Sequence, residues 1–350
     1  MNHIAIDLGG RESQLCVRGE DGRILKESKI ATRSLPKLLA EMKDPSRVIL
    51  ETSAEAFRIA DAALACAHEV RVVPATLVKQ LGVGSRSVKN DRKDARVLSE
   101  VSCRIDLPSV HIPTARSREL KSACGAREAM IHSRTMLINN ARGWLRTQLI
   151  RLATGATNTF PQRLRTHAEA NKVQLPDHVT RLLEAIDVLN RQVKEADKQL
   201  RKIAGEDPVC RRLMTTPGVG PVTAVRFVAS IDDVKRFKSA HAVQSYLGLT
   251  PGENSSSERN QKLGITKAGS SELRRALIQG AWVVMFRAKN DPMAMWAEKI
   301  AARRGKFIAV VALARKLAGI LFALWRDETT YRPSKGAATS KPQFEEPIAA

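Results

Sequence analysis

The order of strands and helices in the first hundred residues constrains the fold of this chain most. Three short strand patterns separated by turn residues such as Glu20-Asp21-Gly22 predict an antiparallel meander. Two further strands then alternate with helical segments, so we expect a mixed sheet flanked by helices. The predicted strands occupy residues 2–10, 14–18, 24–30, 47–51 and 69–73.

The strongly basic composition predicts a polyanionic partner. The 350 residues, enough for two domains, include 58 Lys and Arg against 36 Asp and Glu, giving a formal net charge of +22. Neutralising phosphates and releasing their counterions favours binding of such a chain to nucleic acid. Aromatic residues make up only 4%, so we expect phosphate contacts by Arg and Lys rather than base stacking as the main mode.

Cysteine usage and hydropathy indicate a cytoplasmic protein without a membrane partner. The five cysteines are scattered and none has C-x-x-C spacing, which predicts neither a zinc site nor a disulfide framework. The opening MNHIAIDLGG lacks the pattern of a signal peptide. The longest apolar run, 307–325, carries Arg315 and Lys316 at its centre, so we expect a buried helix rather than a membrane span.

Four acidic residues form a candidate metal site. Asp91 and Asp94 are three apart at the start of a predicted helix, so both face the same way. Asp7 lies near the end of the first predicted strand and Glu51 ends the fourth, and in a ribonuclease-H-like sheet these two strands are neighbours. Four oxygen ligands without His or Cys suit Mg²⁺ or Mn²⁺, and two such ions hold a scissile phosphate. The alternative is an ordinary solvated helix face.

Two long helices are predicted in the middle of the chain. The first, 116–152, is strongly basic and is our candidate for contact with RNA or DNA. The second, 177–203, has apolar residues four and three apart, the spacing of a coiled coil. This spacing fits either a helical hairpin within the chain or pairing between chains. Its heptad positions are Leu182, Ile186, Leu189, Val193, Ala196, Leu200 and Ile203.

The C-terminal third combines a glycine turn with a serine-rich loop. Residues 216–221 have the format of a helix-hairpin-helix module, whose backbone amides approach DNA phosphate. The polar stretch 250–266 reads as a loop before three further helices, and it contains three adjacent serines. Such a run usually marks a flexible turn, but here it lies among basic residues that bind phosphate, where a serine hydroxyl is a candidate nucleophile. The residues from 334 onward predict a disordered tail.

IAIDLGG at residues 4–10 also resembles the first phosphate loop of actin-like sugar kinases and ATPases. That class needs a second glycine-rich phosphate loop and an adenosine motif. The glycine pairs at 82–84 and 218–220 are too short and wrongly placed, and a nucleotide enzyme has no use for a charge of +22.

Several motifs together carry a more specific resemblance, which extends from the first strand to about Pro333. They are IAIDLGG, VILETSAEAF, HEVRVVPATLVKQ followed by KNDRKDARVLSE, PGVGPVTA, and YLGLTPGENSSSERNQKLGITKAGSSELRRALIQGAW. With these motifs the chain resembles transposases of the insertion-sequence one-ten family, relatives of the pilin gene invertase described as bridge-RNA-guided recombinases.

The resemblance implies an α/β plus α fold in four segments. These are a RuvC-like, ribonuclease-H-like DEDD nuclease domain at 1–112, a helical coiled-coil linker at 113–207, a helical transposase domain at 208–333, and a disordered tail at 334–350. By motif the catalytic acids and metal ligands are Asp7, Glu51, Asp91 and Asp94. Ser256 matches the family nucleophile, with Ser255 as the alternative.

The resemblance also implies a mechanism and partners. The metal would polarise the scissile phosphate, and Ser256 would attack it and store the bond as a phosphoserine. Similar proteins form dimers and tetramers, and a non-coding RNA pairs with target and donor DNA in the prokaryotic cytoplasm, at the nucleoid. The alternatives are a hydrolytic RuvC-type Holliday junction nuclease and a non-catalytic nucleic-acid-binding protein. The predicted nucleic-acid contacts are Lys89, Arg92, Lys93, Arg116, Arg127, Arg134, Arg142, Arg146, Arg259, Lys267 and Arg274.

Overall fold

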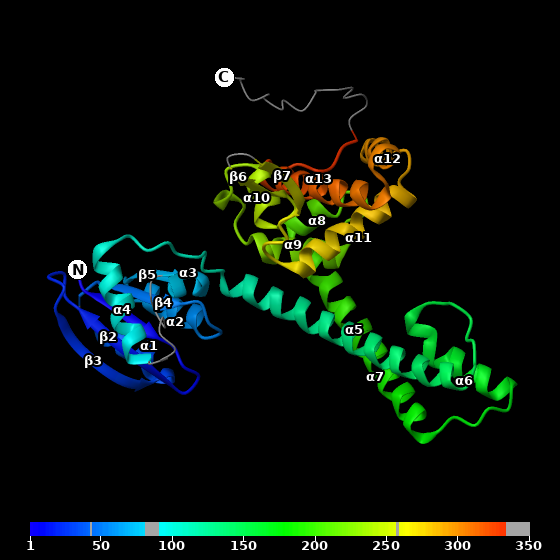
Figure 1. Ribbon diagram of the computed structural model, residues 1–350, viewed down its shortest axis with the longest axis horizontal. Coiled ribbons are helices and arrows are strands. Elements are labelled where there is room, and N and C mark those ends of the chain that lie inside the picture. Colours follow the sequence, from blue (N-terminus) through cyan, green and yellow to red (C-terminus); the bar gives the residue numbers. More distant parts are fainter. Residues whose placement is uncertain (43, 81–90, 257–258, 334–350) are drawn as a thin grey trace. The chain divides into compact units, whose positions relative to one another are not determined.

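The computed structural model describes residues 1–42, 44–80, 91–256 and 259–333. The chain forms two compact units, Met1–Thr114 and Ala115–Ala350 (Figure 1). The predicted tail, 334–350, lies outside the described residues.

The first unit is built on a five-stranded mixed sheet. Its strand order is β3-β2-β1-β4-β5. β1 pairs antiparallel with β2, and β2 with β3, whereas β4 is parallel to both β1 and β5. The predicted meander and mixed sheet are therefore confirmed. The strands are β1 (His3–Asp7), β2 (Glu12–Arg18), β3 (Ile24–Ala31), β4 (Arg47–Glu51) and β5 (Glu69–Val73).

Helices cover both faces of this sheet because the side chains of each strand alternate between two apolar cores. Ile4 and Ile6 pack in the core formed with α1 and α2, whereas Ala5 packs in the core formed with α3 and α4. The helices are α1 (Leu35–Glu41), α2 (Ala56–Ala65), α3 (Ala75–Gln80) and α4 (Asp91–Arg104).

The second unit begins with a hairpin of two long helices, α5 (Ala115–Thr147) and α7 (Asp177–Glu206). They run antiparallel, because Leu120 of α5 shares a core with Leu200 of α7, and Leu145 shares another with Val179. Of the two interpretations of the heptad pattern, this is the hairpin within one chain. A short helix that the sequence did not predict, α6 (Phe160–Ala170), packs on the far end.

Only part of the predicted heptad is buried. The buried residues of α7 are Val179, Leu183, Ile186, Val193, Leu200 and Ala204. The predicted positions Leu182, Leu189, Ala196 and Ile203 are half-buried at the side of the interface. The buried members of the pattern, Ile186, Val193 and Leu200, are seven residues apart, so the packed face of α7 is centred on one of the two heptad stripes and the other lies at its side.

In the described part of the second unit, six further α-helices share one large core with the start of α5 and the end of α7. The residues predicted as a linker are therefore packed into the same unit as the C-terminal helices. The six helices are α8 (Pro208–Leu213), α9 (Pro221–Ile231), α10 (Ala240–Tyr246), α11 (Ser271–Arg287), α12 (Pro292–Arg304) and α13 (Lys306–Arg326).

Within the described residues, α13 is the one helix long and apolar enough to cross a membrane by length and composition. Its apolar side lies in the protein core, where Leu313, Leu317 and Phe322 are buried. Lys316 lies with its Nζ 4.4 Å from the centre of the Trp296 ring. These contacts fit the buried helix expected from the sequence.

The glycine turn between α8 and α9 is packed against α11. Gly218 has a φ of +79°, and a Cβ at this position would lie 2.3 Å from the carbonyl oxygen of Gly280. Only glycine permits both this backbone conformation and so close an approach. The packing of this turn against α11 therefore explains why residue 218 is a glycine.

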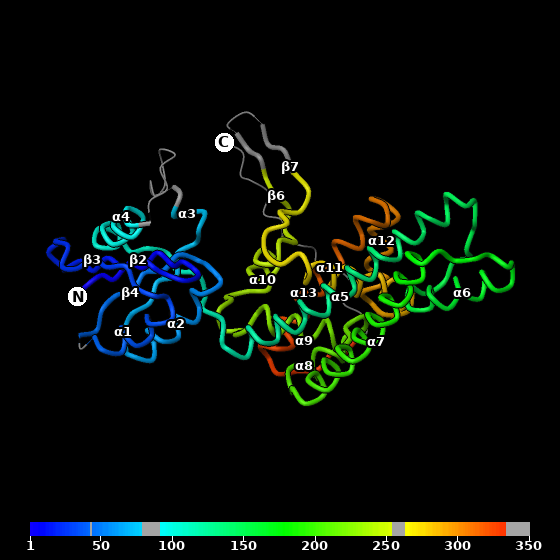
Figure 2. Tube along the Cα trace, turned by 90° about the horizontal axis from the view of Figure 1, so that it is seen from below, coloured from blue at the N-terminus to red at the C-terminus, as the bar shows by residue number. Residues whose placement is uncertain are grey.

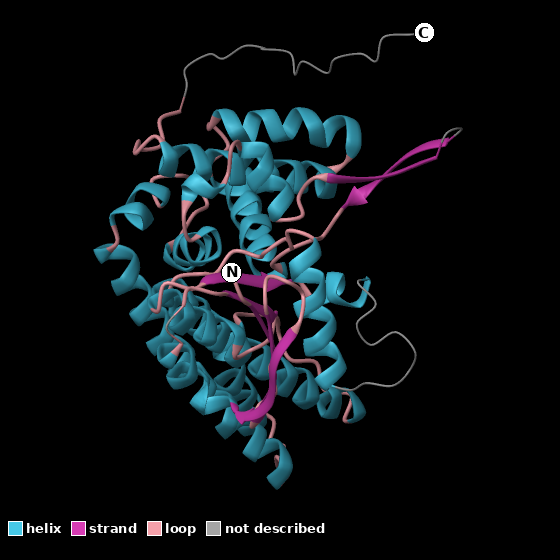
Figure 3. Cartoon of the chain, turned by 90° about the vertical axis from the view of Figure 1, so that its left-hand side faces the viewer, coloured by secondary structure: helices cyan, strands magenta, loops and turns pink. Residues whose placement is uncertain are grey.

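The serine-rich stretch is a β-hairpin rather than the predicted loop. β6 (Pro251–Ser256) pairs antiparallel with β7 (Arg259–Ile265), and the hairpin projects from the helices of the second unit (Figures 2 and 3). The sequence carries no strand signal here, because polar residues occupy consecutive positions and no period-two alternation of apolar residues appears. The two strands are defined by their backbone pairing.

Candidate active site

Asp7 and Glu51 end two adjacent parallel strands at the same level. The pairing of β1 with β4 runs from His3 with Arg47 to Ile6 with Leu50, and the two acids are the next residues on each strand. Neighbouring strands lie about 4.8 Å apart, so the two backbones are close at this edge. By alternation both acids point to the face of the sheet that α4 covers.

The direction of α4 brings its N-terminal end towards the same edge. His3 Nδ1 and Ser102 Oγ are 2.8 Å apart, and Ser99 Oγ lies 3.3 Å from the sulfur of Cys16, which is the partner of Ala5 in β2. The helix therefore runs opposite to β1. The four steps from His3 to Asp7 span about 13 Å, the length of about nine helical residues.

Counting back nine residues from Ser102 reaches Lys93, the neighbour of Asp94. Asp94 is half-buried and lies beside Ala95, which is fully buried together with Leu98. Asp7, Glu51 and Asp94 therefore belong to one edge of the first unit. Asp91 starts α4 one turn earlier, but its side chain, like the whole of Lys89, lies outside the described part of the chain.

All of the candidate ligands at this edge of the sheet are carboxylates. Carboxylate oxygens are the ligands that Mg²⁺ and Mn²⁺ prefer, so the residues at the edge suit a divalent cation. Among the side chains that the structure describes, which do not include Asp91, no three His, Cys, Asp or Glu form a finished metal-binding cluster.

A glutamate on β3 holds α4 in place. Glu27 accepts hydrogen bonds from Arg92 and Arg96, with Oε2 lying 2.6 Å from Nη2 of each arginine. These bonds, chiefly the one from Arg96, lower the pKa of the Glu27 carboxyl to about 2. Arg92, predicted to contact nucleic acid, thus has a partner in its own unit, and its neighbour Lys93 is exposed. Sequence reasoning missed Glu27, because its partners are distant in sequence.

Ser256 is the last residue of β6 and pairs with Arg259, while Ser255 pairs with Asn260. Both serines therefore lie at the end of the hairpin remote from the helices. The side chains of residues 254–262 are not among the described ones, so the predicted Arg259 contact stays a prediction.

The base of the hairpin is tied down by Arg274. Its Nη1 donates to the carbonyl oxygens of Leu247, Ala268 and Gly269, at 3.2, 2.8 and 3.0 Å. We predicted this residue as a phosphate contact; in the structure the same nitrogen serves three backbone groups. Lys267, also predicted, is exposed beside it.

The basic helix α5 directs part of its charge into its own hairpin. Arg116 pairs with Asp207 at 2.5 Å and Arg127 with Asp197 at 2.5 Å. Arg134 donates to the Asn190 side chain at 3.0 Å. Arg142 lies 5.5 Å from the centre of the Phe160 ring, and Arg146 is exposed. Arg127 is 17% exposed, which makes it the most enclosed of the paired arginines on this helix.

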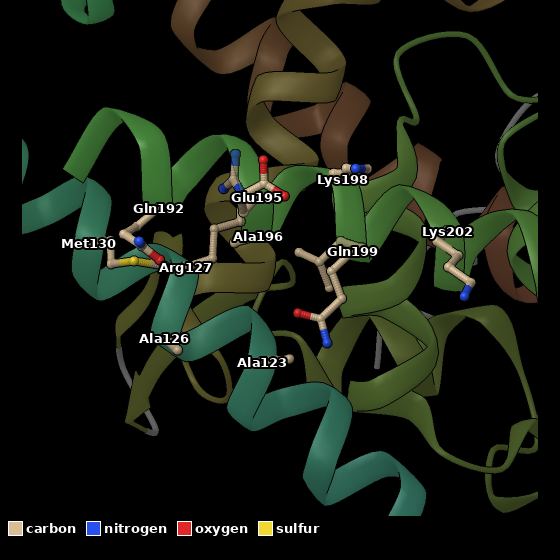
Figure 4. A pocket seen from close by; sticks show the side chains of 11 residues that line it. Ala123, Ala126, Arg127, Met130, Gln192, Glu195, Ala196, Lys198, Gln199 and Lys202 are labelled. Carbon is tan, nitrogen blue, oxygen red and sulfur yellow. The ribbon is translucent and has the colours of Figure 1, made fainter. Parts of the chain in front are cut away.

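A cavity of about 550 Å³ opens between α5 and α7 (Figure 4). Small side chains on α5, Ala123 and Ala126, face longer polar side chains on α7. Arg127, Lys198 and Lys202 supply positive charge there, against the carboxylate of Glu195. The residues that line this cavity include basic side chains but neither a pair of acids nor a nucleophile. The cavity is therefore suited to binding an anion rather than to catalysis.

Two family models match the chain. A DEDD transposase model of IS110 elements matches residues 4–149, which include nearly all of the sheet, α4 and the whole of α5. A second model, described as the transposase IS116/IS110/IS902 family, matches residues 210–297, which include the serine hairpin.

The chain is also similar to curated transposases over nearly its whole length. It is 29% identical to the transposase for insertion sequence element IS1111A of Coxiella burnetii, over 94% of this chain and 91% of the relative. It is 28% identical to a probable family 20 transposase of Pseudomonas aeruginosa, over 95% of this chain and 99% of that relative. It is 27% identical to the transposase for IS1328 of Yersinia enterocolitica, over 94% of this chain and 98% of that relative. The chain belongs to the IS116/IS110/IS902 family of insertion-sequence transposases.

Proposed function

We propose that this transposase cuts and rejoins DNA with two sets of groups, an acidic metal site in its first unit and a serine in its second. The observation that carries this proposal is that Asp7 and Glu51 follow paired residues at the ends of two adjacent strands, and that Asp94 lies on the helix that covers these strands. The strand order β3-β2-β1-β4-β5 supports a RuvC-like, ribonuclease-H-like fold for this unit.

Asp7, Glu51, Asp91 and Asp94 would hold Mg²⁺ or Mn²⁺. A bound ion would supply positive charge to the scissile phosphate and to the oxygen that leaves it. The acids themselves would orient the ions, and α4 would fix Asp91 and Asp94 through its attachment to Glu27.

Ser256 is the proposed nucleophile, with Ser255 as the alternative. Its hydroxyl would lose a proton as Oγ forms a bond to phosphorus and the bond from phosphorus to a deoxyribose oxygen breaks; that oxygen would take up a proton and leave as a hydroxyl. The phosphoserine would keep the energy of the broken bond, so that attack by another DNA hydroxyl reseals the strand without ATP. Because the acids and the serine belong to different units, we propose a dimer or tetramer in which one subunit's acids serve another subunit's serine.

Guide RNA is the proposed source of sequence choice. The exposed basic residues of α5, such as Arg116 and Arg146, offer charge to an RNA or DNA backbone without a base-reading surface. A non-coding RNA from the element's flank would pair with both DNA partners, and the protein would act at the nucleoid.

The test uses the full-length protein with DNA of the element ends and RNA transcribed from its flank. Ser256→Ala should abolish the covalent protein–DNA adduct seen on denaturing gels, while DNA binding stays within twofold of wild type. Ser255→Ala is the matched control and should form the adduct. If Ser256→Ala forms it and Ser255→Ala does not, the nucleophile is Ser255.

A hydrolytic nuclease that uses the same acids is the second candidate, since the acidic edge is independent of the hairpin. It predicts metal-dependent cleavage without any adduct, equal in wild type and Ser256→Ala. That result would remove the serine from the mechanism.

A further inference from the structure

Three aromatic side chains form an exposed cluster on the second unit. Trp282 and Phe286 on α11 stack with ring centres 5.4 Å apart and planes 8° apart, and Phe307 on α13 meets Trp282 edge-on at 6.0 Å. Phe286 is 60% exposed and Phe307 81% exposed. The chain has only 14 aromatic residues, counting Phe, Trp and Tyr, so leaving two phenylalanines in water at one place requires an explanation.

The cluster continues into a groove at the foot of the serine hairpin. This groove has a volume of about 520 Å³ and is mainly apolar. Phe307 and Ile308 of α13 form one wall, and Leu263 and Ile265 of β7 form another. An apolar strip, which we define as Trp282, Phe286, Phe307, Ile308 and Leu263, therefore reaches from α11 to the strand that follows the serines.

Positive charge surrounds this strip. Lys267, Arg304 and Arg315 line the groove, and Lys306 is exposed next to Phe307. A second copy of a chain with a net charge of +22 would bring like charge to these side chains. A nucleic-acid strand would instead place phosphates on the cations and base faces on the rings.

We propose that the strip binds unpaired bases of single-stranded nucleic acid, with the backbone held by Arg304 and Lys306. The proposal rests on the proposed function, because exchange of strands at the hairpin unpairs bases nearby. Stacking on Phe286 and Phe307 needs no particular base, since every base has an aromatic face. The bases belong to a DNA strand opened for exchange, and binding of RNA alone is an outcome of the test.

The test measures the affinity of full-length protein for labelled 20-nucleotide probes: single-stranded DNA, single-stranded RNA of the same sequence, and duplex DNA. Phe307→Ala and Phe286→Ala should each weaken single-strand binding by about 5- to 150-fold, the range for losing one stacked base, with duplex binding within twofold. Phe307→Tyr should keep it. A loss with only one of the two single strands would identify that strand as the source of the bases.

Leu25→Ala is the matched control, because Leu25 is 59% exposed on β3 of the first unit and belongs to none of the proposed binding residues. It should leave all three affinities unchanged. The salt dependence separates charge from stacking: Phe307→Ala should keep the slope of log affinity against log salt, whereas Arg304→Ala should reduce it by about 0.7 on single strands.

Unchanged single-strand binding by both alanine variants would overturn the proposal. So would a shift of the variants to a smaller assembly in light scattering, which would make the strip a contact between subunits. Asp94→Asn should bind the probes normally, so loss of the proposed catalysis would be distinguishable from loss of this site.

Discussion

Gly248 crosses Ala268 at the base of the serine hairpin so closely that no side chain fits between them. A Cβ on Gly248 would lie 2.1 Å from the carbonyl oxygen of Ala268, and the φ of Gly248 is +66°. The amide of Lys267 donates to the carbonyl of Gly248 at 3.1 Å. The two ends of the hairpin are thus joined backbone to backbone before the strands begin.

Gly248→Ala should therefore destabilise the second unit by roughly 2–4 kcal/mol, through the strained φ and the forced separation of the two segments. Thermal unfolding followed by circular dichroism measures this. Gly264→Ala in the same hairpin is the control, because no described atom lies within 4 Å of a Cβ there. Equal melting temperatures for the two variants would contradict the crossing as described.

Arg274→Ala should act on stability rather than on nucleic-acid charge. Removing the guanidinium leaves three carbonyl groups without a donor, at a cost of about 2–3 kcal/mol. The slope of log DNA affinity against log salt should stay at the wild-type value. A slope reduced by about 0.9 with unchanged melting would instead identify Arg274 as a phosphate contact.

Glu27→Gln should loosen α4, and the effect should depend on pH. The folded-state pKa of Glu27 is lowered to about 2, below its usual 4.5, so its stabilisation is fully present above about pH 4.5. It is lost as pH falls through the folded-state pKa. The difference in unfolding free energy between wild type and variant, roughly 1–2 kcal/mol at neutral pH, should shrink between pH 4.5 and 2. A difference that stays constant over this range would exclude the ionised pair as its cause.

Asp94→Asn should lower metal-dependent strand cleavage by about 100-fold or more, because the amide carries no charge with which to hold a cation. Cleavage of labelled element-end DNA in Mg²⁺ measures this. Glu100→Gln, on the same helix and in an exposed pair with Arg104, should keep activity within threefold. Comparable losses in both variants would mean that charge on α4, rather than a metal ligand, matters.

The sequence predicted those features whose signals are local. The β1–β3 meander, the strand that ends at Glu51 and the helix that starts near Asp91 follow from apolar periodicity and turn residues. The hairpin β6–β7 could not be predicted in this way, because polar residues fill every position from 253 to 262 and no apolar residue alternates with them. The partners of Glu27 and Arg274 could not be predicted either. Contacts between segments that are distant in the sequence depend on the fold, and they leave no spacing pattern in the sequence. For the same reason, charge alone did not separate the arginines of α5 that pair within the hairpin from those that face water.

Helix α5 runs without interruption for 33 residues, about 50 Å, and enters the large core at Leu120 and the small core at Leu145. Between these cores Arg127 and Arg134 bind it to α7 by polar contacts. A continuous helix has a fixed rise per residue, so α5 sets the spacing of the two cores at about 38 Å along its axis. The second unit therefore holds its two apolar cores apart by a length that the number of residues in one helix determines.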